Sequence, residues 1–292
     1  MPYEFSQDQI KSYREQGFVL MPSLFDSDDI ERVDQAIDEV VRQAFAAGNY
    51  EAVLELEPRS TKEKPVLRRL KSPFDLHEAF RNLATDDRLL DRVQSLIGPS
   101  IQLQHSKLNM KPAGVGSPVE WHQDLSYFPH TNPDLVTVLV YLDEATKENG
   151  CLQVIPRHHH HFLECHTHDG AFAGMITEDV SRYGEPVPLQ GLAGSAIFMH
   201  CMTPHASLAN QSSKHRRTLI FEYRAGDSYP IYFSPRVAQE ARVARQIRGK
   251  PSRYARLAGP PPLIPAASDA VTSLYDLQTA SKKKLTENRK LQ

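Results

Sequence analysis

Disulfide bridges and membrane spans have little support in this sequence. Its three cysteines, Cys151, Cys165 and Cys201, cannot all pair and show no CxxC spacing, which excludes a complete disulfide framework and fits a reducing compartment. The longest apolar runs, such as residues 135–142 with their one Thr, are far too short to cross a bilayer. The N-terminus also shows no charged-then-apolar leader, so we expect a cytoplasmic protein.

An excess of charge of either sign is also missing. The 292 residues include 34 Lys and Arg against 36 Asp and Glu, which gives a net charge of −2. This balance provides no general attraction to nucleic acid or to an anionic membrane, and we expect neither as a partner. We expect a small-molecule substrate instead, and the sequence leaves the oligomeric state open.

The first hundred residues carry mainly helical patterns. Ser6 and Asp26 each stand at the start of such a pattern and are residues that cap helices well. Apolar residues then recur at helical spacing. The patterns predict helices near residues 6–17, 26–48, 76–83 and 87–97, and a strand at residues 18–21.

From Ile101 the pattern changes to short strands separated by Gly and Pro clusters. Many short strands of this kind predict a closed or nearly closed β barrel with helices packed on its outer sheet. After Pro235 the pattern is helical again and then rich in Pro. We expect one domain, with residues 1–100 as mainly helical support, a core at 101–226 and an extension at 227–292. The predicted strands are residues 101–110, 119–124, 135–142, 151–155, 187–189, 195–199 and 217–224.

The tripeptide His122-Gln-Asp124 is the strongest chemical signal in the sequence. On an extended strand its imidazole and carboxylate project to one face. A further His would complete the facial set of two histidines and one carboxylate that non-haem Fe(II) oxygenases use, with three positions left open for ligands. His205 is the candidate, and His200 is the alternative because it also stands at a strand end.

Two adjacent arginines, Arg216 and Arg217, follow His205 by about eleven positions and begin the last predicted strand. Their guanidinium groups offer the two-pronged donor that a carboxylate needs. The cosubstrate 2-oxoglutarate needs a metal for its 2-oxo acid end and a cation for its far carboxylate. Only one of two neighbouring residues on a strand can point inward, so the pattern alone leaves the choice open.

Three stretches together resemble one enzyme family. They are Trp121–Pro129, Asn149–Pro156, and the pair His205 with Arg216, and they look like the phytanoyl-CoA dioxygenase family. The similarity extends from about Phe5 to Gly226. The sequence departs from the family after the second stretch, where Pro156-Arg157-His158-His159 replaces the usual Pro-Gly-Ser/Thr-His.

The resemblance implies an Fe(II)- and 2-oxoglutarate-dependent dioxygenase that uses O2 and hydroxylates an unactivated C–H bond, releasing succinate and CO2. It implies a mainly β fold with flanking α-helices, built on a double-stranded β-helix core of the jelly-roll, cupin-like type. It favours His122, Asp124 and His205 as iron ligands. It also favours Arg216 over Arg217 as the residue that binds 2-oxoglutarate. The presence of Asp124 argues against halogenation.

Further polar residues are candidates for contact with the cosubstrate. Ser207 could donate its hydroxyl to the far carboxylate, and Asn109 could reach the cosubstrate from a neighbouring strand. The resemblance adds His105, at a position that touches the cosubstrate in some relatives. Each of these residues could instead be a hydrogen-bonded polar group inside the barrel.

Other residues bear on the substrate. Tyr127 and Phe128 should line the mouth of the site. The basic residues Arg68, Arg69 and Lys71 read as a solvated face, but would favour an anionic substrate if their segment folded over the mouth. The run at residues 158–161 consists of four histidines, and we interpret it as a loop at the barrel mouth, since adjacent side chains cannot all converge on one metal.

Alternatives from other classes remain at this level. One is a β-barrel binding or regulatory protein that holds a metal without turnover. Another is a metal-dependent isomerase or hydrolase on a cupin-like barrel, which would not need Arg216. Desaturation, epoxidation or ring closure could also follow from the same initial oxidation. The sequence contains no signature that identifies the substrate.

Overall fold

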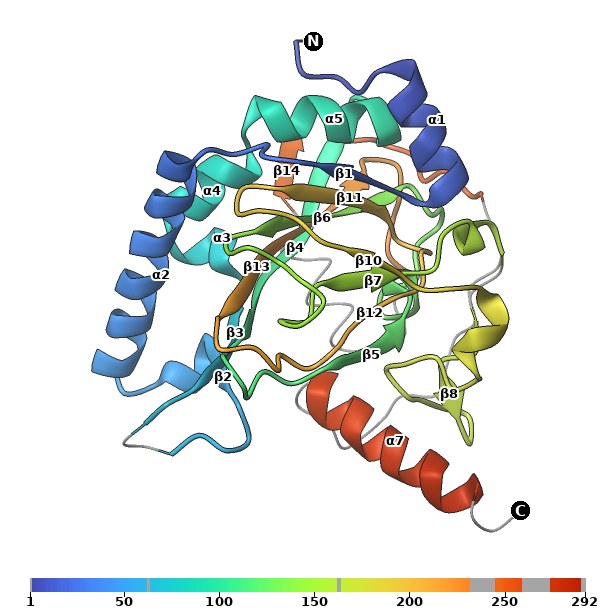
Figure 1. Cartoon of the computed structure of the whole chain (residues 1–292). Helices are drawn as coiled ribbons and strands as arrows, with labels where there is room; N and C mark the ends of the chain where they lie inside the picture. Colours follow the sequence, from blue (N-terminus) through green and yellow to red (C-terminus); the bar gives the residue numbers. More distant parts are fainter. Residues whose placement is uncertain (1, 62–63, 162–163, 232–244, 259–273, 290–292) are drawn as a thin grey trace.

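A computed structural model describes residues 2–61, 64–161, 164–231, 245–258 and 274–289. It consists of two facing antiparallel sheets, with the N-terminal helices on the outer side of the larger sheet and a C-terminal helix beside the smaller one (Figure 1). The main strands are β1 (Phe18–Met21), β2 (Leu54–Leu56), β3 (Leu67–Lys71), β4 (Ile101–Lys111), β5 (Val119–His122), β6 (Leu135–Tyr141), β7 (Leu152–Val154), β10 (Val187–Leu189), β11 (Ala196–His200), β12 (His205–Ser207), β13 (Arg216–Ala225) and β14 (Arg245–Arg248).

The larger sheet has the strand order β1-β11-β6-β13-β4-β3-β2, with β14 also paired to β4. The smaller sheet has the order β10-β7-β12-β5, and a separate hairpin joins β8 (Thr167–His168) to β9 (Ala171–Phe172). This pair of sheets is the double-stranded β-helix core that the resemblance predicted. The helices are α1 (Gln7–Gln16), α2 (Ser27–Ala46), α3 (Pro73–Leu76), α4 (Glu78–Ala84), α5 (Asp87–Ile97) and α7 (Leu274–Arg289).

The N-terminal helices begin where the capping residues predicted. Ser6 and Asp26 each form a capping box, in which the side chain accepts from the backbone of the third helical residue and that residue's side chain reaches back. Figure 1 shows α1, α2, α4 and α5 around the outer side of the larger sheet. Their buried apolar side chains join the outward face of that sheet in one core, for example Phe80 and Leu89 with Phe221.

The opposite face of the larger sheet looks toward the smaller sheet. Leu139, Ile197 and Ile220 from the larger sheet pack with Leu152 and Val154 from the smaller one. Because side chains alternate along a strand, the same strands contribute to the helical core and to the space between the sheets. The space between the sheets is therefore partly filled by apolar packing and partly left for polar groups.

The structure differs from the predicted elements in several places. Strands β2 and β3 fall within the part predicted as helical support and extend the larger sheet. Residues 245–248 form a strand where a helix was predicted, and most of that predicted helix lies outside the described residues. Strand β5 ends at His122, so Asp124 lies beyond it, in the short 3-10 helix η2 (Asp124–Ser126). The division into support, core and extension stays a prediction.

The turn that departs from the family pattern keeps a left-handed conformation. Arg157 has φ 66° at the place where the family usually has glycine. The next residues form the 3-10 helix η3 (His158–His160), which begins the histidine run. The conformation that glycine normally supplies is thus adopted here by an arginine.

Gly17 ends α1 and forms hydrogen bonds with the turn that precedes β12. It closes the helix in the left-handed conformation, with φ 87°. Its carbonyl accepts hydrogen bonds from the backbone of His200 and from Thr203 Oγ1, both at 2.9 Å. The N-terminal helix therefore supports the short segment that leads into His205.

Helix α7 lies beside β5 (Figure 1). Gln278 accepts a hydrogen bond from the backbone N–H of Glu120 at 3.2 Å and donates to the carbonyl of Gly174 at 2.8 Å. Lys282 also forms an ion pair with the side chain of Glu120. Within the described ranges, none of the helices combines the length and apolar character of a membrane span.

Three buried histidines lie outside the HxD motif and its distal partner. Burial lowers the pKa of His130 to about 3 and the pKa values of His159 and His166 to about 4. A ring nitrogen of each histidine forms a hydrogen bond with a backbone carbonyl. The carbonyl belongs to Phe128 for His130, to Arg14 for His159 and to Glu164 for His166. These rings are uncharged in the folded protein at neutral pH.

The first stability prediction concerns Gly17. A Cβ at this position would lie 2.5 Å from Thr203 Oγ1, in addition to the strain of a positive φ. Gly48 has a similar positive φ with open space around it, so Gly48→Ala should lose only about 1–2 kcal/mol of unfolding free energy. We expect Gly17→Ala to lose about 1–3 kcal/mol more, because it also crowds its neighbours. Urea unfolding measures both, and equal losses would contradict this account.

The second prediction concerns acid stability of the metal-free protein. The unfolded chain binds protons on histidine below about pH 6.5, whereas the folded chain keeps His130, His159 and His166 neutral down to about pH 3–4. The unfolding free energy should therefore fall as the pH falls from 6.5 toward 4. The slope should be up to about 1.4 kcal/mol per pH unit for each histidine. Urea titrations in this range measure the slope, and His130→Asn should make it shallower by about one proton. An unchanged slope would contradict the role of His130.

Candidate metal centre

The two strands β5 and β12 bring two histidines together. The strands pair antiparallel, and His205 lies directly opposite His122 in their register. The ring centroids are 4.0 Å apart, and both side chains are buried. Residues 83 positions apart along the chain thus meet because the smaller sheet pairs the strands that carry them.

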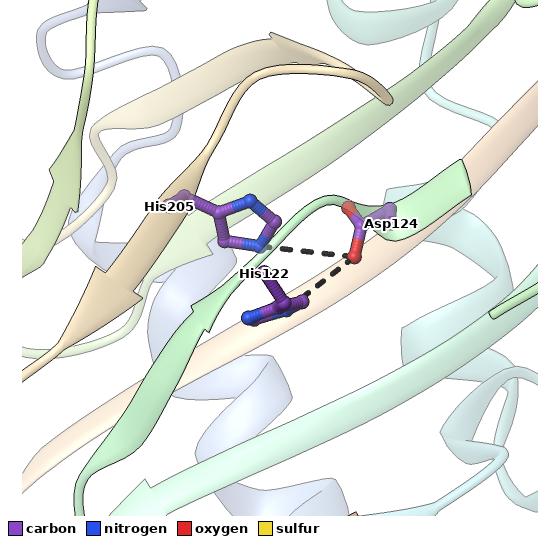
Figure 2. A group of neighbouring side chains, drawn as sticks. All are labelled: His122, Asp124 and His205. Carbon is purple, nitrogen blue, oxygen red and sulfur yellow. Dashed lines mark ion pairs between the residues drawn. The ribbon is translucent and has the colours of Figure 1, made fainter. Parts of the chain in front are cut away.

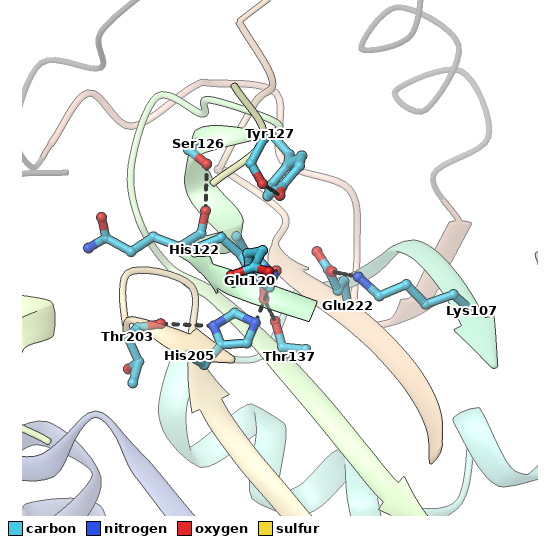
Figure 3. Close-up of polar contacts among 12 residues, drawn as sticks. Lys107, Glu120, His122, Ser126, Tyr127, Thr137, Thr203, His205 and Glu222 are labelled. Carbon is cyan, nitrogen blue, oxygen red and sulfur yellow. Dashed lines mark hydrogen bonds and ion pairs between the residues drawn. The ribbon is translucent and has the colours of Figure 1, made fainter. Parts of the chain in front are cut away.

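A backbone carbonyl holds each of the two imidazole rings through its Nδ1 atom. His122 Nδ1 lies 2.7 Å from the carbonyl oxygen of Glu120, and His205 Nδ1 lies 2.9 Å from that of Thr203 (Figure 3). A carbonyl can only accept, so each Nδ1 carries the proton and each Nε2 keeps its lone pair. Such backbone contacts fix the tautomer and the orientation of a metal-binding histidine.

Asp124 faces both Nε2 atoms. Its Oδ1 lies 3.7 Å from Nε2 of His122 and 3.7 Å from Nε2 of His205 (Figure 2). Its other oxygen, Oδ2, accepts a hydrogen bond of 2.7 Å from Thr137 Oγ1 on β6. One oxygen is therefore fixed by the larger sheet, and the other points toward the histidines.

The charge states of His122 and Asp124 suit a cation. Burial, followed by the electrostatic interaction with the imidazole of His205, holds the pKa of His122 well below its usual range. Burial alone would raise the pKa of Asp124, but the electrostatic interactions with His205, Lys107 and His122, with the hydrogen bond from Thr137, hold it at about 2. At neutral pH His122 is uncharged and Asp124 is ionised, which are the forms that bind metal.

The three side chains fit a single metal ion. Their ligand atoms lie within 4.8 Å of one another, and no other group of three metal-ligating residues of this kind is found in the described part of the chain. The 3.7 Å separations are shorter than two metal–ligand bonds of about 2.1 Å each placed end to end. Two imidazoles and one carboxylate are the donor set that suits non-haem Fe(II).

A cavity reaches these residues, and Arg216 is part of its wall. The Arg216 side chain is buried, and its terminal nitrogens donate to Thr218 Oγ1 at 2.7 Å and to the carbonyl of Gly150. Its Nε has no hydrogen-bond partner among the described residues. Arg217 points the other way and pairs with Asp34 and Asp143.

The predicted cosubstrate residues occupy different places. Ser207 and Asn109 line the same cavity as Arg216. His105 does not line it; its Nε2 lies 3.1 Å from the buried carboxylate of Glu222, and its ring meets the edge of Phe128.

The aromatic residues after the motif pack around the centre and do not line the cavity. Tyr127 meets the ring of His122 edge-on at 5.4 Å between centroids, and its hydroxyl donates to the carbonyl of Gly174. Phe128 packs against His105. Of the basic run, Arg69 lines the cavity, whereas Arg68 and Lys71 do not.

The remaining histidines lie elsewhere. His200 accepts from the backbone of Met202 and packs near His159, beneath α1. Within the histidine run, His158 contacts Glu164, and His159 contacts the carbonyl of Arg14. These contacts give the run partners in the protein without a metal.

Thr137 is a site residue that the sequence reasoning missed. It is the one polar residue within the apolar strand β6, and its hydroxyl holds Asp124. That isolated polar residue was the available signal, because a buried hydroxyl needs a partner.

Comparison with known proteins places the chain in a family. The family model described as phytanoyl-CoA dioxygenase (PhyH) matches residues 13–218. A probable alpha-ketoglutarate-dependent hypophosphite dioxygenase of Stutzerimonas stutzeri is 27% identical over 232 residues, which cover 77% of this chain and 80% of the relative. An ectoine dioxygenase of Bordetella parapertussis is 25% identical over 242 residues, or 75% of each chain.

Solved structures show the same fold. The structure of EctD from S. alaskensis with bound Fe superimposes with a TM-score of 0.70 at 22% identity, covering 84% of this chain and 87% of that one. The match of the family model spans more than half of the chain and includes all three residues of the candidate centre. The chain therefore belongs to the phytanoyl-CoA dioxygenase family and is an Fe(II)- and 2-oxoglutarate-dependent dioxygenase.

Proposed function

We propose that His122, Asp124 and His205 hold the Fe(II) ion, that Arg216 binds the far carboxylate of 2-oxoglutarate, and that the enzyme hydroxylates a C–H bond of a small molecule. The observation that carries this proposal is the convergence of two Nε2 atoms and one carboxylate oxygen in a cavity that also contains a buried arginine. Ser207 and Asn109 line the same cavity and are proposed to contact the cosubstrate.

The bound iron supplies the activation of dioxygen, coupled to the conversion of 2-oxoglutarate to succinate and CO2. The protein supplies placement. The carbonyls of Glu120 and Thr203 keep the Nε2 lone pairs of the two histidines directed at one point. Thr137 keeps one oxygen of Asp124 occupied, so that the other faces the metal position.

Arg216 has the properties that a carboxylate anchor needs. Its guanidinium group is fixed by Thr218 and by the carbonyl of Gly150, which limits the freedom that would be lost on binding. Burial strengthens its attraction for an anion, because little water competes. Apolar side chains of Leu139, Leu152 and Ile220 line the same cavity and exclude water from the reacting atoms.

The names of the relatives support a small substrate. They include a hypophosphite dioxygenase, an ectoine dioxygenase and an L-proline trans-4-hydroxylase of Streptomyces griseoviridis, which is 26% identical over 255 residues. A substrate as small as those of the relatives suits a metal site that lies between two sheets. The direct test is succinate formation that requires Fe(II), 2-oxoglutarate and O2 together.

The prediction for the metal compares two histidines. His205→Ala removes one proposed ligand and should weaken Fe(II) binding by at least about tenfold and abolish succinate formation. His161→Ala, in the exposed part of the histidine run, should leave both unchanged. Iron content after desalting and succinate release measure the two effects. Iron retention by His205→Ala, or loss of iron in His161→Ala, would contradict the assignment.

The prediction for Thr137 tests the support of Asp124. Thr137→Val keeps the shape of the side chain and removes the hydroxyl that donates to Oδ2. We expect Fe(II) affinity or turnover to fall by about 10–100-fold, while the metal-free protein stays folded at the assay temperature with a somewhat lower thermal unfolding midpoint. Thr137→Ser retains a hydroxyl and should recover most of the loss. If Val and Ser variants bind iron equally well, the hydrogen bond does not support the ligand.

A further inference from the structure

Helix α7 covers the free edge of the strand that carries His122. Strand β5 is the last strand of the smaller sheet and pairs with β12 on one side. Helix α7 lies along its other side (Figure 1), where the backbone N–H of Glu120 donates to Oε1 of Gln278 at 3.2 Å. The edge group is thereby satisfied by a side chain instead of a further strand. The match of the family model ends at residue 218, so the family pattern does not predict this contact.

The amide group of Gln278 is buried and has partners at both of its ends. The residue is 3% exposed. Its Nε2 donates to the carbonyl of Gly174 at 2.8 Å and lies 3.4 Å from the hydroxyl of Tyr127. One side chain of α7 thus joins β5, the segment after the HxD motif and the segment after β9. A buried amide with partners at both ends is held in one orientation.

The contacts of Gln278 lead to His122 by two routes. In the first, Oε1 binds Glu120, whose carbonyl oxygen lies 2.7 Å from Nδ1 of His122. In the second, Nε2 lies beside the hydroxyl of Tyr127, whose ring meets the ring of His122 edge-on at 5.4 Å between centroids. Gln278 therefore contacts the residue that orients the imidazole through a hydrogen bond and the residue that packs against it.

Specific contacts, more than apolar burial, hold α7 in place. Among the described side chains of the helix, those of Tyr275, Gln278 and Ser281 are buried. Tyr275 lies over the guanidinium group of Arg68, at 4.2 Å from its central carbon. Two cavities of about 520 and 230 Å³ border the helix, so little apolar area is removed from water there. The position of α7 consequently depends on the polar contacts of Gln278.

Helix α7 has no direct access to the metal position. Among the described residues, those that line the cavity with the three candidate ligands include none from α7. An effect of Gln278 on iron must therefore pass through the orientation of His122. Two imidazoles with fixed rings bind a metal more tightly than rings that first have to be ordered.

We propose that Gln278 is a positioning residue of the iron centre, which holds Glu120 and Tyr127 so that the ring of His122 keeps its metal-binding orientation. The proposal rests on the function proposed above, in which His122 is a ligand. Coupling between two binding events is reciprocal, so the docking of α7 should tighten by the same factor when Fe(II) is bound. A helix that only stabilised the fold would show no such coupling.

The first test replaces Gln278 with methionine. Gln278→Met keeps an unbranched side chain with similar helix propensity and removes both polar atoms. We expect Fe(II) affinity to fall by about 3–10-fold, less than the 10–100-fold loss typical of a residue that touches the ligand itself. Calorimetry on the full chain without oxygen measures the affinity. Thermal unfolding of the metal-free protein shows that the variant is folded at the temperature used.

Lys282→Met is the matched control on the same helix. It removes the ion pair with the side chain of Glu120 and leaves the main-chain contact of Glu120 with Gln278 in place. The lysine side chain is 60% exposed and that of Glu120 is 25% exposed, so the pair contributes little. Fe(II) affinity should stay within about twofold of the wild-type value.

The second test measures the reciprocal effect and needs no change at Gln278. Lys283 is exposed on α7, and tryptic cleavage after it reports how often the helix opens. Saturating Fe(II) should slow this cleavage in the wild-type protein by about 3–10-fold, the same factor as the affinity change. Neither Gln278→Met, which lacks the coupling, nor His205→Ala, which lacks a ligand, should show this protection. Mass spectrometry follows the released peptide.

Three results would overturn the inference. In the first, Gln278→Met binds Fe(II) as tightly as the wild-type protein. In the second, Lys282→Met loses as much affinity as Gln278→Met. In the third, Fe(II) leaves the cleavage of wild-type α7 unchanged. Failure of the proposed function looks different, because His205→Ala would then bind Fe(II) as tightly as the wild-type protein does.

Discussion

The candidate centre depends on the antiparallel pairing of β5 with β12, because this register places His205 opposite His122. A shift by one residue would turn one of the rings to the other face of the smaller sheet. Asp124 follows just after β5 and is held by Thr137 from the larger sheet. The positions of the three ligands therefore depend on the strand register within the smaller sheet and on the distance between the two sheets. The tight packing of Ile197 and Leu139 against Leu152 maintains that distance.

The larger sheet serves two functions with its two faces. On β4, Leu108 and Met110 point to the core beneath the helices, whereas Lys107 and Asn109 alternate with them and line the cavity. The apolar face supplies stability through burial. The polar face must satisfy its groups locally, as Lys107 does with Glu222. Arg69 and Arg216 each keep one nitrogen without a hydrogen-bond partner among the described residues, so this local satisfaction is incomplete.

Sequence reasoning located the parts of the site that depend on short-range patterns. The HxD motif, two candidate distal histidines and the arginine pair stand out by spacing, and the family resemblance favoured His205 and Arg216. The structure brings His122, Asp124, His205 and Arg216 to one cavity. The alternation of side chains along a strand already implied that only one of Arg216 and Arg217 could face inward. The same rule could not say which, because both faces of β13 are buried, and only the partners of Arg217 decide it.

Strand β3 escaped prediction because it has no apolar alternation; its inward side chain is Arg69, and Arg68 is buried by an ion pair. Charged residues in such a strand read as a loop until their partners are known. Thr137 was hidden for the opposite reason, as a single polar residue in an apolar run. Contacts between residues distant in sequence, such as Thr137 with Asp124, leave no mark in local periodicity.

Glu120 illustrates a role that sequence comparison does not reveal. Its carbonyl orients the ring of His122, and its N–H is bound by Gln278 from the far end of the chain. Its side chain forms an ion pair with Lys282. The orientation of the iron ligand is thus transmitted through main-chain atoms, which every amino acid except proline can provide. Evolution can vary the residue at this position while the connection between the C-terminal helix and the centre stays intact.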